Sequence, residues 1–378
     1  MSGSVRPGRR RVALVTAAGQ RGGAEVIMEL LAARLPAHGV DPVLAVPEDA
    51  LLCRQWHDAG QRVCPLPAFG RLRRLDQGAR VVVEVARRFR DAGIELIHSH
   101  GVAAQIHAGL AARRLQRPAI YHVHDLFDPG WSADGALQRL ALRVPAARTV
   151  AISASVAASL RGRVPAAQLQ TLVDGVDRMI VAPAPAAAAL GPLIVWCGRL
   201  QQWKGPHHFI EAARHIHRER PDARFALVGG TLFGLEPAYA GALRMQARVA
   251  GLEDAMLFTG HVDDARPWLR AASVVVHSSD RPEPFGLVMA EAMMQERPVA
   301  AFRHGGAAEI VLDGETGRLV TPGDAAALGL SVVDILRDPA RAQAMGDAGR
   351  RRALQYFDAD VMAAAVAAVY DSIPDQHE

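Results

Sequence analysis

Short apolar runs alternate with longer amphipathic stretches along the first half of the chain. The apolar runs span Val12–Ala17, Pro42–Val46, Ile94–His98, Ala119–His124 and Thr149–Ser153. Segments with helical spacing of apolar residues lie between these runs, near residues 24–35, 79–91, 102–115 and 136–143. Strands that alternate with helices in this way predict a parallel sheet covered by helices on both faces.

The second half of the chain repeats this pattern. Its apolar runs span Leu193–Cys197, Arg224–Val228, Ala255–Phe258, Ser273–His277 and Pro298–Ala301. Between the halves, Ala182–Ala189 is rich in alanine and proline and has no amphipathic period, which predicts a linker. We therefore predict an α/β protein of two doubly wound, Rossmann-like domains facing a central cleft, at 1–180 and 181–358. The remaining segment, 359–378, should begin with a helix over Ala359–Ile373.

Length and cysteine content agree with two domains in a reducing compartment. A chain of 378 residues, half of them hydrophobic, exceeds the size at which a single core usually stops growing. Cys53, Cys64 and Cys197 form an odd and widely spaced set that does not indicate a disulfide framework. The apolar run after Arg9 is only about seven residues long, so it predicts a first strand and not a signal peptide. We expect a cytoplasmic protein.

Charge divides unequally between the halves. Residues 1–180 carry 24 basic and 15 acidic residues, whereas residues 181–378 carry 19 and 24. The basic half predicts an anionic or lipid-linked acceptor, or contact with the inner membrane face; a solvated helical face is an equally good interpretation. The arginines that would form this basic surface include Arg71, Arg73, Arg74, Arg87, Arg88 and Arg90. Aromatic residues make up only 5% of the chain, so few side chains are available to stack on the bases of a nucleic acid. We therefore expect that the protein does not bind nucleic acid.

Two glutamates mark the best candidate site. Glu283 and Glu291 flank a predicted loop-to-helix junction, because Pro284 and Gly286 oppose helix formation while Leu287 to Met294 favours it. The first amides of a helix favour an anion, and neighbouring carboxylates favour hydroxyl groups. A sugar joined to a nucleoside diphosphate offers both kinds of group. The alternative is a loop that merely caps a buried helix.

A second motif supplies positive charge. Only one of the 43 basic residues is a lysine, Lys204, and it lies five residues beyond Arg199 in a predicted strand-to-helix connection. Cations at the carboxyl end of a strand lie where open α/β sheets bind phosphates. Arginine can grip two oxygens with its planar fork, and lysine acts as a compact charge. A solvated loop is the competing interpretation.

Together these motifs resemble those of the retaining nucleotide-sugar glycosyltransferases of family 4, which have the GT-B fold. The matching segments are Gly198-Arg199-Leu200 with Lys204-Gly205, Glu283-Pro-Phe-Gly-Leu-Val with Glu291, Gly305-Gly306 with Glu309, and Asp313-Gly-x-Thr-Gly317. The resemblance implies that Arg199 and Lys204 bind the donor diphosphate, that Glu291 holds the ribose and that Glu283 contacts the sugar. It also implies that the main chain of Phe285, Gly286 and Leu287 lies against the sugar and phosphates.

The same resemblance extends to the first half, which would bind the acceptor, and to the last helix, which would cross back to it. Gly22 and Gly23 resemble the glycine loop beneath the donor phosphates, although a bare tight turn explains them nearly as well. Phe258-Thr-Gly-His-Val262 resembles the segment whose main chain meets the nucleotide base, although a strand followed by a helix cap at Asp263-Asp264 explains it equally well. His124 matches the histidine that borders the acceptor and the donor sugar. Asp174 stands where relatives usually carry asparagine.

Two His-x-His pairs end two predicted strands: His98 with His100, and His122 with His124. Because alternate residues share one face of a strand, each pair could offer two nitrogens to zinc. No carboxylate or cysteine is spaced to complete such a site, so we favour no metal. The resemblance instead makes His100 part of a structural loop, and we expect His122 to be packed inside.

We therefore expect a retaining, metal-independent hexosyltransferase that uses a UDP- or GDP-sugar, needs no other cofactor and serves polysaccharide biosynthesis. The diphosphate leaving group needs no protonation, so a pair of acids of the glycosidase type is not required. The alternatives are a nucleotide-sugar epimerase of similar architecture and a non-catalytic protein that binds anionic surfaces.

Overall fold

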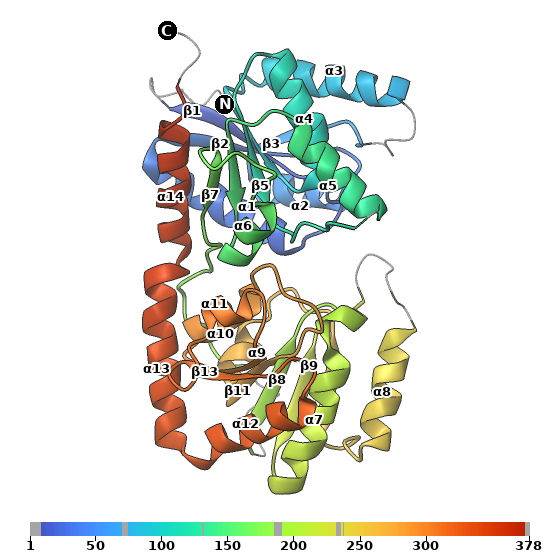
Figure 1. The fold of residues 1–378 in the computed structure, drawn as a ribbon, viewed down its shortest axis with the longest axis vertical. Coiled ribbons are helices and arrows are strands. Elements are labelled where there is room, and N and C mark those ends of the chain that lie inside the picture. The colour runs from blue at the N-terminus through green and yellow to red at the C-terminus, as the bar shows by residue number, and fades with distance from the viewer. Residues whose placement is uncertain are drawn as a thin grey trace. The chain divides into compact units, whose positions relative to one another are not determined.

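The computed structural model describes residues 9–69, 75–130, 132–184, 191–231, 236 and 238–374. The chain forms two compact units, residues 1–175 together with 359–378 and residues 176–358. Each unit is built on one parallel sheet (Figure 1). The predicted α/β fold with two Rossmann-like sheets is confirmed.

The first unit contains a seven-stranded sheet with strand order β3-β2-β1-β4-β5-β6-β7. Its strands are β1 (Arg10–Val15), β2 (Val40–Pro47), β3 (Val63–Leu66), β4 (Leu96–His100), β5 (Ala119–Val123), β6 (Arg148–Ala151) and β7 (Leu169–Thr171). Its helices are α1 (Gly23–Arg34), η1 (Leu35–His38), α2 (Leu51–Asp58), α3 (Leu75–Asp91), α4 (Val102–Arg114), α5 (Ala133–Arg143), α6 (Ala154–Leu160) and α14 (Ala359–Asp371). The C-terminal helix α14 packs against α1 (Figure 1).

The second unit contains a six-stranded sheet with strand order β10-β9-β8-β11-β12-β13. Its strands are β8 (Leu193–Cys197), β9 (Arg224–Val228), β10 (Met256–Gly260), β11 (Val274–His277), β12 (Val299–Phe302) and β13 (Gly317–Val320). Its helices are η3 (Gln202–Lys204), α7 (Pro206–Glu219), α8 (Tyr239–Val249), α9 (Arg266–Ala271), α10 (Leu287–Met294), α11 (Ala307–Ile310), α12 (Ala325–Arg337) and α13 (Pro339–Tyr356).

The predicted strands lie at these positions, with ends shifted by one or two residues in several cases. The sequence pattern missed β3, β7 and β13, which are strands of three or four residues, each at an edge of its sheet. So short a run carries too few apolar positions to reveal its period. The predicted linker, Ala182–Ala189, falls mostly outside the described residues, which stop at 184 and resume at 191.

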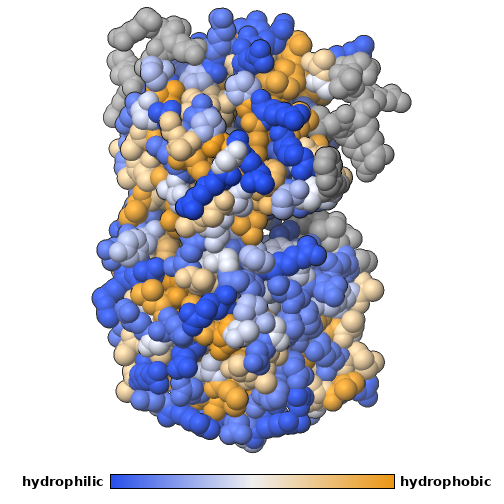
Figure 2. All heavy atoms as spheres, viewed as in Figure 1, coloured by the Kyte–Doolittle hydropathy of each residue, from blue (hydrophilic) through white to orange (hydrophobic). Residues whose placement is uncertain are grey.

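Each sheet is covered by helices that bury continuous apolar clusters. Phe89 and Leu66 lie in the core of the first unit, and Phe209 and Phe225 lie in that of the second. Side chains cap several helix starts: Ser132, Ser153, Asp324 and Asp338 accept hydrogen bonds from first-turn amides. Across the face drawn in Figure 2, hydrophilic and hydrophobic residues are interspersed. In the described part of the chain, no helix combines the length and apolarity that crossing a bilayer requires.

Candidate functional site

The turn after β8 carries the two predicted phosphate-binding cations. Arg199 follows the strand at Gly198, and Lys204 ends the short helix η3. Gly205 then adopts a left-handed conformation (φ 66°), and a Cβ there would collide with the Ser278 carbonyl oxygen. The Ser278 hydroxyl donates a 2.7 Å hydrogen bond to the Gly205 carbonyl. The turn is therefore locked against the loop that follows β11, so Lys204 and Glu283 can meet.

Lys204 and Glu283 form a close ion pair. The Lys204 Nζ lies 2.6 Å from Glu283 Oε1 and 4.2 Å from the centre of the Trp203 ring. The side chains are 18% and 8% exposed. The Ser279 hydroxyl donates to Glu283 Oε2 at 3.0 Å, and His277 Nε2 lies 3.3 Å from the same oxygen. The carboxylate is thus anchored at both oxygens.

These partners decide the ionisation state of Glu283. Burial alone would raise the pKa of this carboxyl, but the charge of Lys204 and the contacts with His277 hold the pKa well below its usual range. Glu283 is therefore an anion at neutral pH. An anion held this firmly is suited to accept hydrogen bonds from hydroxyl groups, and it is not suited to donate a proton.

The helix after this loop begins where the sequence predicted. Gly286 takes a left-handed conformation (φ 100°) and leads into α10, Leu287–Met294. The Phe285 side chain is buried and packs edge-on against Phe357 at 5.8 Å between ring centres. Only the main chain of Phe285 is therefore placed to meet a ligand. Gly306 donates its N–H to the Glu283 carbonyl at 2.8 Å. This hydrogen bond connects the Gly305-Gly306 segment to the loop that carries Glu283.

Glu291 lies in α10 within electrostatic reach of Cys197 and Arg266. Burial raises the pKa of the Cys197 thiol to about 12, with a further increase from Glu291 and a decrease from Lys204. Hydrogen bonds that Arg266 donates to Asp264, together with the charges of neighbouring carboxylates, Glu291 among them, raise the pKa of Arg266. The charges of Lys204 and Glu291 therefore both act on the end of β8. This is the region where the sequence motifs predict the donor site.

Gly22, Gly23 and His124 belong to the first unit, and the other predicted site residues belong to the second. Gly22 precedes α1, and its N–H donates to Glu25 Oε2 at 3.0 Å; the neighbouring Gly23 is exposed. Val262 lies in the loop after β10 and is half-buried.

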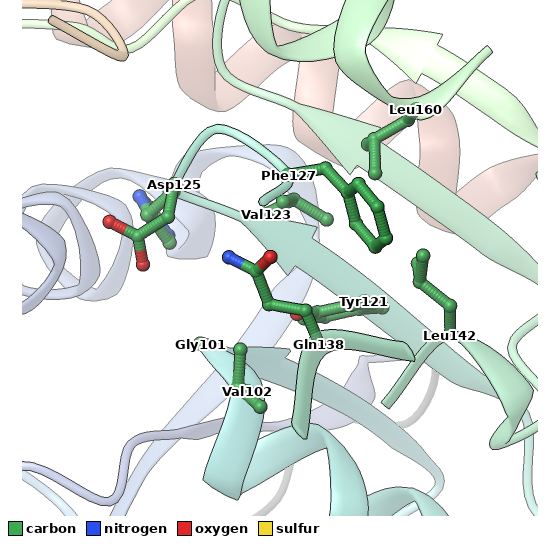
Figure 3. A pocket seen from close by; sticks show the side chains of 10 residues that line it. Gly101, Val102, Tyr121, Val123, Asp125, Phe127, Gln138, Leu142 and Leu160 are labelled. Carbon is green, nitrogen blue, oxygen red and sulfur yellow. The ribbon is translucent and has the colours of Figure 1, made fainter. Parts of the chain in front are cut away.

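His124 borders a small pocket in the first unit. Its lining combines residues at the carboxyl ends of β4 and β5 with side chains of α5 and α6, and Phe127 points between Leu142 and Leu160 (Figure 3). Burial lowers the pKa of His124 to about 4, so the ring is neutral at pH 7. Its Nδ1 lies 3.9 Å from Asp174 Oδ2. Burial also raises the pKa of Asp174 well above its usual range, and Asp174 Oδ1 has no partner among the described residues.

Three residues of the second unit escaped the sequence analysis. His277 and Ser279 hold Glu283, and Arg266 lies near Glu291. His277 could have been noticed as a polar residue that ends a buried strand six residues before Glu283. Arg266 carries no such signal, because its proximity to Glu291 arises only through folding.

Comparison with known proteins gives matches in both units. The family model described as Glycosyltransferase Family 4 matches residues 21–179, and the model described as Glycosyl transferases group 1 matches residues 191–338. A lipopolysaccharide core biosynthesis mannosyltransferase, LpcC, from Rhizobium leguminosarum bv. viciae is 34% identical over 53% of this chain. A GDP-mannose-dependent alpha-(1-6)-phosphatidylinositol monomannoside mannosyltransferase from Mycolicibacterium smegmatis is 37% identical over 50% of it.

These matches span little more than half of the relatives' own lengths, 58% and 53%. A solved structure covers more of the chain. HepE from Anabaena, in complex with UDP and glucose, superposes with a TM-score of 0.85 at 26% identity, over 97% of this chain and all of that one. With both units matched by family models and the GT-B neighbours confirming the fold, the chain belongs to the glycosyltransferases of family 4.

Proposed function

We propose that this chain transfers a sugar from a nucleoside diphosphate sugar to an acceptor, with retention of the anomeric configuration and without a divalent cation. The observation that carries the proposal is the Lys204–Glu283 pair beside the start of α10. It places a cation, an anion and free helix amides in one place, as a ligand with both phosphates and hydroxyls requires.

In the second unit we assign each group a part in donor binding. Arg199, Lys204 and the first amides of α10 bind the diphosphate, while Glu283 accepts hydrogen bonds from the sugar. Glu291 holds the ribose diol, and the loop at Val262 meets the base. UDP bound by HepE and GDP-mannose named for the mycobacterial relative support a UDP- or GDP-sugar.

The chemistry follows from these charges. As the bond between the anomeric carbon and the phosphate oxygen breaks, negative charge grows on the diphosphate and positive charge on the sugar. Arg199, Lys204 and the helix start stabilise the first, and Glu283 stands near the second. The departing phosphate takes the acceptor proton on the same face, so no side chain has to act as a base.

For the first unit we propose acceptor binding. The small pocket beside His124 brings the Tyr121 ring and five apolar side chains next to the amide of Gln138, and we propose that the acceptor lies at its mouth. We also propose that Gly22 and Gly23 approach the donor phosphates and that neutral His124 borders the transferred sugar.

The proposal is tested by incubating the purified chain with a panel of UDP-, GDP- and ADP-sugars and measuring released nucleotide. One donor should be hydrolysed slowly, at a rate that Lys204→Met reduces by about a hundredfold. Release that is equal for all donors, or unchanged in the variant, would overturn it. NMR of a transferred sugar would then distinguish retention from inversion.

Nucleotide binding checks the role of Glu291 separately. Glu291→Gln preserves the shape and removes the charged acceptor, so the donor nucleotide should bind more weakly by about 1.5–3 kcal/mol. Titration calorimetry measures this change. Glu253, an exposed glutamate in the turn after α8, provides the control, since Glu253→Gln should leave affinity unchanged.

We further propose a cytoplasmic protein whose basic first unit meets an anionic or lipid-linked acceptor at a membrane surface. Arg71, Arg73 and Arg74 lie outside the described residues. Arg87 and Arg88 are paired with Glu84, Asp91 and Glu48 on and beside α3, which reduces the charge that they present. Sedimentation with anionic liposomes at low and high salt tests this proposal, and an absence of binding at low salt would reject membrane contact.

A further inference from the structure

Four histidine rings gather on one face of the first unit's sheet. His98 and His100 lie on β4 and His122 on β5, and the strand register pairs the Cα atoms of His100 and His122. His98, His100 and His122 are each no more than 2% exposed. One ring nitrogen from each of the three lies within 4.8 Å of the other two. The fourth ring, His124, follows β5.

Four ring nitrogens of these three histidines have no hydrogen-bond partner among the described residues. They are His98 Nε2, His100 Nε2 and both ring nitrogens of His122. A buried polar group without a partner costs about 1–3 kcal/mol. Four such nitrogens in one cluster therefore favour a ligand that can satisfy several of them together.

In two of these rings the other nitrogen, Nδ1, has a hydrogen-bond partner, as is usual for histidines that bind a metal. His98 Nδ1 lies 2.7 Å from the Tyr370 hydroxyl of α14. His100 Nδ1 lies 2.9 Å from His124 Nε2. Histidine ligands commonly use one nitrogen for such an outer hydrogen bond and offer the lone pair of the other to the ion. Here the nitrogen left over is Nε2 in both rings.

We propose that His98, His100 and His122 bind a divalent transition metal ion of the zinc class inside the first unit. Zinc accepts neutral imidazole at about 2.0–2.1 Å, which places ligand nitrogens about 3.3 Å apart around a tetrahedral ion. Each nitrogen has to move by about 1 Å from its place in the cluster to reach this spacing. A solvent molecule completes the coordination.

The site links three parts of the unit. It joins β4 to β5 directly and holds α14 through His98 and Tyr370. Through His100 it also sets the tautomer of His124, because a metal on His100 Nε2 obliges Nδ1 to carry the proton that is donated to His124. The ion is thus structural and positions His124; it takes no part in binding the diphosphate.

Metal content provides the first test. Tag-free protein expressed with added zinc, then desalted, should retain about one zinc per chain by mass spectrometry. X-ray absorption at the zinc edge should show nitrogen neighbours at about 2.0–2.1 Å and no sulfur. Replacement by cobalt should give the visible absorption of a tetrahedral ion. A chain without retained metal after this exposure would overturn the proposal, with buried water the better explanation.

Variants provide the second test. His122→Leu should abolish retention and lower the midpoint of thermal unfolding, because it removes a ligand. Without a metal the same change would raise or preserve the midpoint, since it removes two unsatisfied nitrogens. A raised or preserved midpoint in His122→Leu would therefore contradict the proposal, whatever the other variants do.

Two matched controls exclude other sites. His107→Leu removes another buried histidine of the same unit, one that bonds to the Ala103 carbonyl, and it should retain the metal. His208→Ala disrupts the other described cluster that could hold an ion, His207 with His208 and Asp280, and it should retain the metal as well. Loss of zinc in His208→Ala, with retention in His122→Leu, would place the ion in the second unit and sink the assignment.

Discussion

At the scale of single residues, the Lys204–Glu283 pair joins stability to chemistry. From its position in a loop, Lys204 should be replaceable without any effect on folding. The structure corrects that expectation, because the ammonium partners a carboxylate that is only 8% exposed. Removing one member of a buried pair leaves an uncompensated charge.

Substitutions at Lys204 should therefore separate the two roles. Lys204→Ala should lower both turnover and the free energy of unfolding, the latter by about 3 kcal/mol. Lys204→Arg keeps a charge that can pair with Glu283, so stability should persist. Its guanidinium is broad and prefers planar pairing with the carboxylate, so turnover should fall about a hundredfold. Steady-state kinetics and thermal midpoints measure both effects, and an arginine variant with parental turnover would remove Lys204 from the mechanism.

Asp174 offers a prediction that depends on pH. Burial raises its pKa in the folded chain above the unfolded value of about 3.9. The folded state then binds more protons than the unfolded state, so this residue lowers stability progressively as pH rises above about 4. Asp174→Asn should remove that loss.

The gain in thermal midpoint for Asp174→Asn should consequently be larger at pH 8 than at pH 5. Differential scanning calorimetry at both pH values measures it. Asp49→Asn is the control, because Asp49 is exposed on the same unit. An equal gain at the two pH values would show that ionisation of the Asp174 carboxyl does not lower the stability of the folded state.

At the scale of elements, the candidate site depends on how two loops are pinned together. The turn after β8 and the loop after β11 meet at Gly205 and Ser278, where no side chain larger than glycine's hydrogen fits. Gly205→Ala should push the loops apart, lower the thermal midpoint and displace Lys204 from Glu283. Turnover should fall with the midpoint.

The matched control for that substitution is Gly241→Ala. Gly241 lies within α8, and a Cβ there would meet nothing within 4 Å. Alanine in a helix interior is favoured over glycine by about 1 kcal/mol, so this variant should be slightly more stable and equally active. A Gly205→Ala protein with parental turnover would show that the pinned loops do not position the lysine.

At the scale of the whole molecule, the proposed mechanism supplies diphosphate charge from the protein alone. Turnover should be unchanged when excess EDTA is present in the assay and no magnesium or manganese is added, because Arg199, Lys204 and the start of α10 replace an exchangeable cation. Kinetics with and without EDTA measure this. Activity restored only by magnesium or manganese would contradict the mechanism. It would leave the histidine site unaffected, since that site is judged by retained metal.

Much of the fold could be read from local pattern. The strands β8 and β9 and the helix α10 have the predicted bounds, because apolar runs bordered by a glycine specify them without help from distant residues. The short strands β3, β7 and β13 could not be recognised in this way. Their few residues become strands only because a neighbouring strand offers hydrogen-bond partners.

The sequence by itself determined the family, the fold class and the candidate cations and carboxylates, since each is carried by residues close together in the chain. Only the tertiary structure decided that Lys204 neutralises Glu283, 79 residues away, and that His277 and Ser279 hold it. It also decided that two His-x-His pairs on separate strands form one buried cluster, closed by Tyr370 from the last helix. Contacts between residues so distant in sequence arise when whole strands and helices pair and pack, so no short stretch of the sequence shows them.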